Sequence, residues 1–362
     1  MKIDDKTSHN SPSLRFPEFT GEWEYFSIND VCSEFKSGKN IKADLISSNG
    51  NFPVYGGNGL RGYTSSYNHD GLYVLIGRQG ALCGNVRSVF GKIYITEHAI
   101  AVAGNEKSDT NFLHYLFLKM NLGQYSDQSA QPGLAVNKLL KLKVLLPSIS
   151  EQIKIAKLLS LLDERIAVQS RLIEDLKKLR CAVSNKLFQS VKGVVIPLSG
   201  ISNIVKGKQI NGDFLAEVGE YYVMNGGTEP SGYYDNYNVE ANTISISEGG
   251  NSCGYVQFNR MPFWSGGHCY TIQDIVSDVE TLYLYHYLKS KEDSIMKLRI
   301  GTGLPNIQKK DLAEFKVIIL AIEQQRTISN ILSLLERKTE IEGRMLIAMR
   351  TEKQYLLHQM FI

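Results

Sequence analysis

Three glycines near residue 60 have the spacing of a nucleotide-binding loop. The segment VYGGNGLRGY, residues 54–63, contains G-x-G-x-x-G at Gly57, Gly59 and Gly62. In a dinucleotide-binding fold these glycines follow a strand, and the pyrophosphate lies at the N-terminus of the helix that comes next. Here they are followed by TSSYNHDG, which is rich in turn residues and lacks a helical period. The motif by itself is therefore weak evidence for a dinucleotide site.

Histidines and cysteines are the other residues whose chemistry needs to be considered. His98 stands beside Glu97, but neither His98 nor His268 has a second histidine at metal-ligand spacing. We interpret both as structural histidines, and Cys83 and Cys253, each followed by glycine, as small core residues. The five cysteines include no C-x-x-C pair, which is typical of a reducing cytoplasm. The sequence thus predicts no catalytic residue and no metal site.

Length and composition place the chain among soluble globular proteins of two or three domains. It has 362 residues, of which 43% are hydrophobic and 21% charged. The polar start MKIDDKTSHNSPS and the lack of an apolar run of about 18 residues predict a cytoplasmic protein without a membrane span. The net charge is only +3, and residues 191–322 hold 11 basic and 14 acidic side chains. Any contact with a polyanion must therefore come from local loops.

An internal repeat decides how the glycines are interpreted. The segment VYGGNGLRGYTSSYN aligns with MNGGTEPSGYYDNYN, and LIGRQGALCGNV aligns in the same register with SISEGGNSCGYV, which places Cys83 on Cys253. In the second copy Glu229 and Ser231 replace Gly59 and Arg61, and Pro230 lies between them. A helix start shaped around a pyrophosphate does not tolerate these residues. The repeat therefore predicts a glycine turn between strands and excludes the dinucleotide site.

A second pair of matching segments predicts two long helices. LLSLLDERIAVQSRLIEDLKKLRCAVSNKLF aligns with ILSLLERKTEIEGRMLIAMRTEKQYLLHQMF, and each copy follows an apolar run and a Glu-Gln pair, Glu151-Gln152 or Glu323-Gln324. We expect an α+β fold in which two similar domains of twisted, mostly antiparallel strands also carry short helices, at NFLHYLFLKM and TLYLYHYLKS. The expected divisions are 1–147 for the first domain, 148–190 for the central helix, 191–320 for the second domain and 321–362 for the distal helix.

Both long segments carry apolar residues at a period of 3.5 for about four heptads, as in a coiled coil. The alternative is that each is an amphipathic helix packed only on its own domain. The polar interruptions fall at the same ladder positions in both copies, which favours packing of the two helices on each other. The expected interface residues are Leu162, Ile166, Ile173, Leu176, Arg180 and Leu187 in the first helix, and Leu335, Glu342, Leu346, Met349, Leu356 and Met360 in the second.

The charges at the ladder predict that the helices run antiparallel. A parallel pair would place Arg180 opposite Lys353, whereas an antiparallel pair places Arg180 opposite Glu342 and Gln169 opposite Lys353. Helices of about 35 residues would extend about 50 Å. Two unlike domains held by such a rod suit DNA, on which dimeric readers contact sites roughly 34 Å apart.

Several segments resemble the specificity subunit of type I restriction–modification enzymes. They are LRFPEF with the following Trp23, FKSGK, the glycine turns, SEQIKIAKLLSLLDERI and EQQRTISNILSLLE, and together they cover nearly the whole chain in order. The resemblance implies two target-recognition domains that read a bipartite site in double-stranded DNA. It also implies that two modification (methyltransferase) subunits dock on the helices, and that restriction subunits join the full complex.

The same resemblance implies a non-catalytic subunit without a cofactor of its own, because the partner methyltransferase binds S-adenosylmethionine and modifies the adenine. The chain contains no N/D-P-P-Y/F tetrad and no Walker A motif, in agreement with that role. A duplicated RNA-binding or scaffold protein without a methyltransferase partner is the alternative. It predicts that the tyrosines of the glycine turns bind single strands.

Candidate DNA-contacting residues are the bidentate donors and lysines of the predicted loops, because base edges are read by Arg, Lys, Asn and Gln and phosphates are bound by Lys and Ser/Thr. Tyr63, Tyr67, Tyr233 and Tyr237 are possible stacking residues, and Glu248, at the place of Arg78, is expected to shape its turn. The candidates are Lys36, Lys39, Asn58, Arg61, Arg78, Gln79, Arg87 and Gln131 in the first domain, and Lys206, Lys208, Gln209, Asn225, Thr228, Asn251, Ser252, Thr302 and Asn306 in the second.

Overall fold

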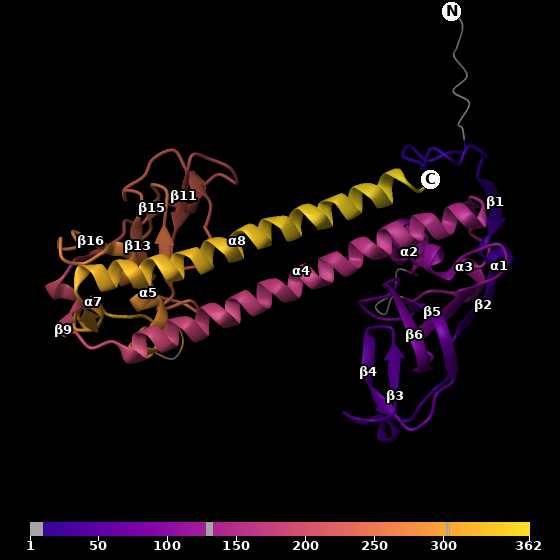
Figure 1. Ribbon diagram of the computed structural model, residues 1–362, viewed down its shortest axis with the longest axis horizontal. Coiled ribbons are helices and arrows are strands. Elements are labelled where there is room, and N and C mark those ends of the chain that lie inside the picture. The colour runs from indigo at the N-terminus through magenta and orange to yellow at the C-terminus, as the bar shows by residue number, and fades with distance from the viewer. Residues whose placement is uncertain (1–9, 128–132, 302, 304) are drawn as a thin grey trace, which may run out of the picture. The chain divides into compact units, whose positions relative to one another are not determined.

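The computed structural model describes residues 10–127, 133–301, 303 and 305–362. The chain forms two compact units, Met1–Gln169 with Met345–Ile362, and Ser170–Arg344. Two long helices, α4 (Ile149–Ser190) and α8 (Ile322–Gln359), are each continuous, and each contributes a segment to both units (Figure 1). Among the described residues, no helix combines the length and apolar character that crossing a membrane requires.

The first unit is built on a six-stranded sheet with the strand order β2-β7-β5-β6-β3-β4. Neighbouring strands are antiparallel except β3 and β6, which pair in parallel. A separate antiparallel ladder joins β1 to β8. The elements of this unit before α4 are β1 (Glu24–Ser27), α1 (Ile28–Val31), β2 (Cys32–Ser37), β3 (Phe52–Gly56), β4 (Gly59–Thr64), β5 (His69–Gly77), β6 (Val86–Ile95), β7 (Ala99–Gly104), α2 (Thr110–Met120), α3 (Val136–Leu139) and β8 (Lys143–Leu146), with 3₁₀ turns at Ala43–Leu45 and Leu122–Tyr125.

The core of the first unit includes the end of the chain. Trp23 is buried and meets Phe112 and Phe361 edge-on, with ring centroids 6.2 and 6.5 Å apart. Phe112 and Phe361 stack at 5.0 Å, so the last residues of the chain cover α2. Burying side chains of this size is worth roughly 1.5–3 kcal/mol each, so this cluster fixes the C-terminus to the first unit.

The second unit repeats this plan with shorter strands. Its main sheet has the order β10-β16-β13-β14, β12-β11-β15 forms a second sheet, and β9 pairs with β17. The elements are β9 (Val194–Pro197), β10 (Asn203–Lys206), β11 (Tyr221–Met224), β12 (Tyr233–Tyr234), β13 (Thr243–Ser247), β14 (Val256–Asn259), β15 (Trp264–Ser265), β16 (Cys269–Gln273), α5 (Thr281–Ser290), α6 (Glu292–Met296), α7 (Lys309–Ala313) and β17 (Lys316–Ile319), with 3₁₀ turns at Leu198–Gly200 and Gly212–Phe214.

The two units differ where the second copy has a proline. The long strand β6 of the first unit corresponds to β14 and β15 of the second, which are separated by a short segment that includes Pro262. Proline has no amide hydrogen to donate to a ladder, so it interrupts a central strand. One sheet of six strands in the first unit therefore becomes two smaller sheets in the second.

A buried glutamine joins each long helix to the domain before it. Gln152 accepts the Asp109 amide at 2.9 Å and donates to the carbonyls of Lys107 and Pro147, also at 2.9 Å. Gln325 accepts the Glu280 amide and donates to the carbonyls of Asp278 and Leu320, each at 2.8 Å. Both side chains are fully buried. The equivalent of Gln152 is thus Gln325, one residue beyond the Glu-Gln pair noted in the sequence.

The long helices run antiparallel in each unit, which confirms the predicted polarity (Figure 1). Asp163 of α4 meets Lys353 of α8 at 2.5 Å in the first unit, and Arg180 of α4 meets Glu336 of α8 at 3.0 Å in the second. Along α4 Arg180 comes after Asp163, whereas along α8 its partner Glu336 comes before Lys353, so the two helices run in opposite directions. The ladder positions are the buried or half-buried face of both helices, and the fold is α+β as predicted.

The predicted register of the helix pair is wrong. Arg180 forms its ion pair with Glu336 at 3.0 Å, and Glu342 forms one with Lys338 on its own helix at 2.5 Å. Lys353, which the prediction placed opposite Gln169, forms its ion pair with Asp163. The prediction paired residues that both lie on the ladder. In the structure, Arg180 and Lys353 instead bind carboxylates that lie one position beyond the ladder of the other helix, Glu336 and Asp163.

Candidate nucleic-acid interface

The glycine segment of the first unit forms a hairpin, as the repeat predicted. Gly57 lies in the turn between β3 and β4, and Gly59 and Gly62 belong to β4 itself. No helix follows, because Gly59–Thr64 is a strand. The geometry that a pyrophosphate needs, a helix N-terminus behind the glycines, is therefore not formed by this segment.

Four of the predicted contact residues of the first unit come together at this hairpin. A cleft of about 430 Å³ is lined by Gly57, Asn58, Arg61, Gln79, Gly80 and His98. The guanidinium of Arg87 lies against the turn, since a Cβ placed on Gly59 would stand 3.0 Å from its Cζ. Asn58, Arg61, Gln79 and Arg87 therefore converge from separate segments of the unit. They carry donors and acceptors that suit the edges of bases in a DNA major groove.

The sequence predicts a structural role for His98, and the structure places this residue in the lining of the cleft. Its Nδ1 lies 2.9 Å from Gln79 Oε1 and its Nε2 lies 3.2 Å from Glu97. No group of three or more metal-ligating side chains occurs in the portion of the chain that the structure describes. His98 thus orients the Gln79 amide. In the sequence, this role is indicated by the alignment of His98 with His268 in the second copy.

The turn that carries Arg78 and Gln79 is held by a cysteine and a close approach of two backbones. Cys83 Sγ donates to the Arg78 carbonyl at 3.2 Å, and burial raises the pKa of this thiol above its usual range. Gly84 has a φ of +86°, and a Cβ at that position would meet the Gly123 nitrogen at 2.2 Å. Only glycine satisfies both conditions. The equivalent Gly254, which follows Cys253, also has a positive φ, of +92°.

The equivalent turn of the second unit has a carboxylate where the first has Arg78. Glu248 is buried, and it accepts from Lys206 Nζ at 2.6 Å and from the Tyr270 hydroxyl at 3.1 Å. Cys253 Sγ donates to the Glu248 carbonyl at 3.0 Å, as Cys83 does to Arg78. Glu248 therefore shapes the turn and holds Lys206, a candidate phosphate contact whose side chain is half exposed.

The other candidates of the second unit are spread over several loops. The Asn225 Oδ1 accepts the His268 amide at 3.1 Å, and the Lys208 carbonyl accepts the Trp264 indole at 2.9 Å. Asn306 bridges to Gly249, next to Glu248. The exposed candidates of this unit are Lys208, Gln209, Thr228 and Asn251, and Ser252 is half-buried. In the first unit Lys39 is exposed, and Lys36 forms an ion pair with Glu34 at 3.2 Å. Gln131 and Thr302 lie outside the described residues.

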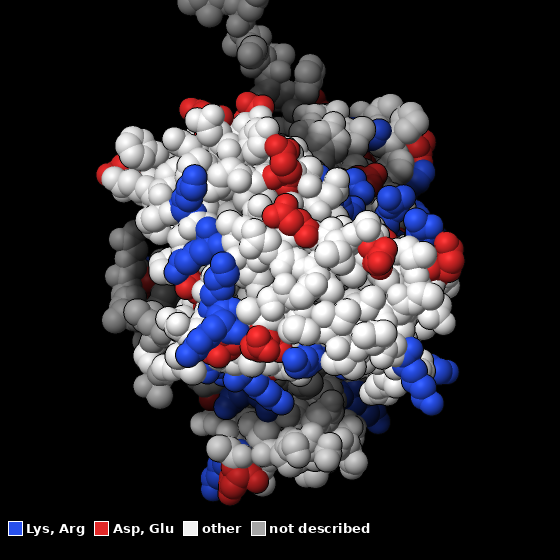
Figure 2. Space-filling view, turned by 90° about the vertical axis from the view of Figure 1, so that its left-hand side faces the viewer, with Lys and Arg blue, Asp and Glu red and all other residues white. Residues whose placement is uncertain are grey.

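Charge is unevenly distributed on the second unit. Figure 2 shows the side that carries β9 and α7 in Figure 1, where lysine and arginine side chains gather along the left border and acidic side chains are scattered over a mostly uncharged centre. The excess of acidic residues in 191–322 therefore does not make the whole surface negative. Local basic regions remain available to a polyanion.

Both long helices also expose apolar side chains that sequence analysis did not single out. Leu161 and Val168 of α4, in the first unit, are 48% and 70% exposed. Leu334 and Ile341 of α8, in the second unit, are 65% and 47% exposed. The alignment of the two helix sequences places Leu161 on Leu334 and Val168 on Ile341, so each unit presents the same apolar stripe. In the sequence, these exposed side chains can be recognised as apolar residues that lie outside the a/d ladder.

Comparison with known proteins gives a consistent picture. The family model described as "Type I restriction modification DNA specificity domain" matches residues 20–178 and again 191–348. The EcoprrI specificity subunit of Escherichia coli is 45% identical over 154 residues, which cover 41% of this chain and only 38% of that protein. A putative type I specificity subunit of Mycoplasma genitalium is 24% identical over 92% of both proteins.

A solved structure shares the fold over the whole chain. The crystal structure of the type I restriction–modification S subunit from Mycoplasma genitalium has a TM-score of 0.77 and 23% sequence identity, and the match covers 97% of this chain and 99% of that one. Because the family model matches both halves of the sequence, and both halves fold as similar domains on a shared helix pair, the chain belongs to the type I restriction–modification DNA specificity family.

Proposed function

We propose that this protein is the sequence-specificity subunit of a type I restriction–modification system. It reads a bipartite site in double-stranded DNA, with one half-site for each unit, and it acts in the cytoplasm without a catalytic residue of its own. The observation that carries this proposal is the duplication itself, since two similar but non-identical domains on one antiparallel helix pair suit two different half-sites.

Base reading is assigned to the loops around the glycine turns. In the first unit Asn58, Arg61 and Gln79 line one cleft, Arg87 lies against its glycine turn, and Arg78 precedes Gln79 in the chain. In the second unit the carboxylate of Glu248 is buried and bound to Lys206. Because the two turns differ in charge and in donors, the two units are expected to prefer different bases.

The apolar stripes of α4 and α8 are assigned to the methyltransferase subunits. Exposed apolar patches mark interaction sites in soluble proteins, and these two stripes have equivalent positions in the repeat. Two equivalent stripes fit two copies of one partner. That partner binds S-adenosylmethionine and modifies the target adenine, and restriction subunits join the complex for cleavage.

Sequencing of methylated bases tests the function directly. DNA from a host that carries this chain with its neighbouring methyltransferase should contain methyladenine in one motif with two defined parts and an unspecified spacer. DNA from the same host with the gene deleted should lack that motif. An unchanged set of methylated sites, together with binding of single-stranded RNA by the purified protein, would instead favour the duplicated RNA-binding alternative.

A further inference from the structure

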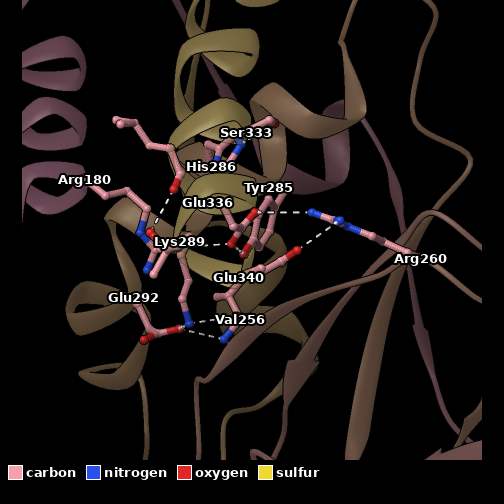
Figure 3. Close-up of polar contacts among 12 residues, drawn as sticks. Arg180, Val256, Arg260, Tyr285, His286, Lys289, Glu292, Ser333, Glu336 and Glu340 are labelled. Atoms are coloured by element: carbon pink, nitrogen blue, oxygen red, sulfur yellow. Dashed lines mark hydrogen bonds and ion pairs between the residues drawn. The ribbon is translucent and has the colours of Figure 1, made fainter. Parts of the chain in front are cut away.

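A carboxylate of α8 joins three elements of the second unit. Glu336 Oε1 accepts from Arg180 of α4 and from the Tyr285 hydroxyl of α5, both at 3.0 Å. Arg260, from the segment between β14 and β15, lies 3.9 Å from the other oxygen of Glu336 and 3.4 Å from Glu340 (Figure 3). The helix pair and the recognition domain are thus bonded through one side chain.

The first unit contains the same arrangement with the two long helices exchanged. Asp163 of α4 accepts from the Tyr115 hydroxyl of α2 at 2.9 Å and from Lys353 of α8 at 2.5 Å. Lys353 Nζ also lies 5.7 Å from the centroid of the Tyr115 ring. The alignment of the two helix sequences places Asp163 on Glu336 and Arg180 on Lys353. We call these the two triads: Asp163, Tyr115 and Lys353, and Glu336, Tyr285 and Arg180.

Because the tyrosines of both triads are buried, their hydroxyl groups must keep their hydrogen-bond partners. Tyr115 and Tyr285 are 3% and 5% exposed. Burial, and then the neighbouring carboxylate, raises the pKa of both hydroxyls above the ordinary value, so each hydroxyl remains a donor. A domain that turned on its helix would leave a tyrosine hydroxyl and a carboxylate oxygen without partners, which is costly away from water.

We propose that the two triads are positioning elements for bipartite reading, which lock each recognition domain and the register of the helix pair so that the complex accepts a single distance between half-sites. This inference rests on the proposed function. Adding one base pair between the half-sites moves the second one by about 3.4 Å and rotates it by about 35°. A domain with a locked attachment cannot follow that movement, whereas a domain with a loosened attachment can.

Methylation of duplexes with different spacers measures this property. The specificity subunit, assembled with its methyltransferase subunits, is offered the preferred site and sites with one base pair more or less. Tyr115→Phe and Tyr285→Phe remove only the hydroxyl that ties the domain to the carboxylate. In these variants the rate at the neighbouring spacers, relative to the preferred spacer, should rise roughly tenfold, as expected for the loss of one hydrogen bond to a charged group. The bases of each half-site should stay the same.

Two further variants separate positioning from general destabilisation. Asp175→Asn breaks an exposed ion pair with Lys178 on α4 and should keep the wild-type spacer ratio. Asp163→Asn removes the charge that both Lys353 and the Tyr115 hydroxyl bind, and it should relax the ratio as well.

The outcomes also distinguish this inference from the proposed function. An unchanged spacer ratio in both tyrosine variants would overturn the positioning role, and so would an equal loss of methylation at every spacer in complexes that assemble normally. If the wild-type complex methylates no bipartite site at all, the proposed function itself fails.

Discussion

At the scale of single residues, the repeat preserves the bonds that shape the turns and varies the charge of the side chains that the turns carry. Cys83 and Cys253 make the same bond, each to a carbonyl earlier in its own turn. The residues that carry those carbonyls are Arg78 and Glu248, which differ in charge. The cysteine bonds can be retained because they involve backbone atoms, so the turn keeps its shape while its side chain changes.

Two histidines, the half-buried His114 and the buried His286, predict how stability depends on pH. Burial is the main cause that lowers the pKa of His114 and of His286 to about 4, with Lys353 beside the first and Arg180 and Arg260 near the second. The nearby Asp163 carboxylate acts in the opposite direction and raises the pKa of His114. The unfolded chain therefore binds protons below about pH 6.5 that the folded chain does not bind until about pH 4. Stability is present at neutral pH and should fall as pH drops through this window, by up to on the order of 3 kcal/mol for each histidine.

Urea unfolding between pH 7 and pH 4.5 checks this expectation. His286→Gln should flatten the pH dependence of the second unit, and His114→Gln that of the first. Other groups titrate in the same range, so the comparison of variant with wild type carries the result. Parallel curves for wild type and both variants would show that these histidines are not responsible.

At the scale of elements, the helix pair shows what heptad periodicity can and cannot predict. The period of 3.5 identifies which face of α4 and α8 is buried, and the ladder charges favour the antiparallel arrangement. The register depends on carboxylates that lie one position beyond the ladder, Asp163 and Glu336, and on tyrosines of α2 and α5. Because those tyrosines belong to other elements, two helix sequences considered by themselves led to the wrong register.

The apolar stripes predict one bound methyltransferase for each helix. Replacing Leu161 and Val168 by glutamine should weaken one partner site at least about a hundredfold, because burial of each such side chain is worth roughly 1.5–3 kcal/mol. Replacing Leu334 and Ile341 should weaken the other. Native mass spectrometry should then find one methyltransferase in each double variant and none in the quadruple variant.

Phe90 provides the control for this experiment, since it is 81% exposed and belongs to strand β6 rather than to either long helix. Phe90→Gln should leave two methyltransferase copies bound. Two bound copies in all of the helix variants would rule out the stripes as docking sites.

At the scale of the whole molecule, one chain contains two units of the same plan with different loops and one broken strand. Each unit has its own core and its own sheet, and the differences concentrate in the turns and near Pro262. Reading specificity is therefore expected to be divisible between the units.

An exchange of one recognition domain tests this division. Replacing residues 191–322 by the corresponding residues of a relative should change one half of the methylated motif and leave the other half and its methylation intact. Sequencing of methylated bases in a host that carries the hybrid provides the measurement. A simultaneous change of both halves would contradict the assignment of one half-site to each unit.

The sequence by itself determined the repeat, the two long helices, their polarity and the rejection of a dinucleotide site, because each of these depends on local periodicity or on comparing one copy with the other. Only the tertiary structure decided the register of the helices and the joining of strands into one sheet in the first unit. It also decided the gathering of Asn58, Arg61 and Gln79 at one cleft, with Arg87 against its turn, and the burial of Glu248 against Lys206. These features depend on contacts between residues far apart in the chain. Their partners are selected by packing and by the need to pair buried charges, neither of which is expressed in the spacing of residues along one segment.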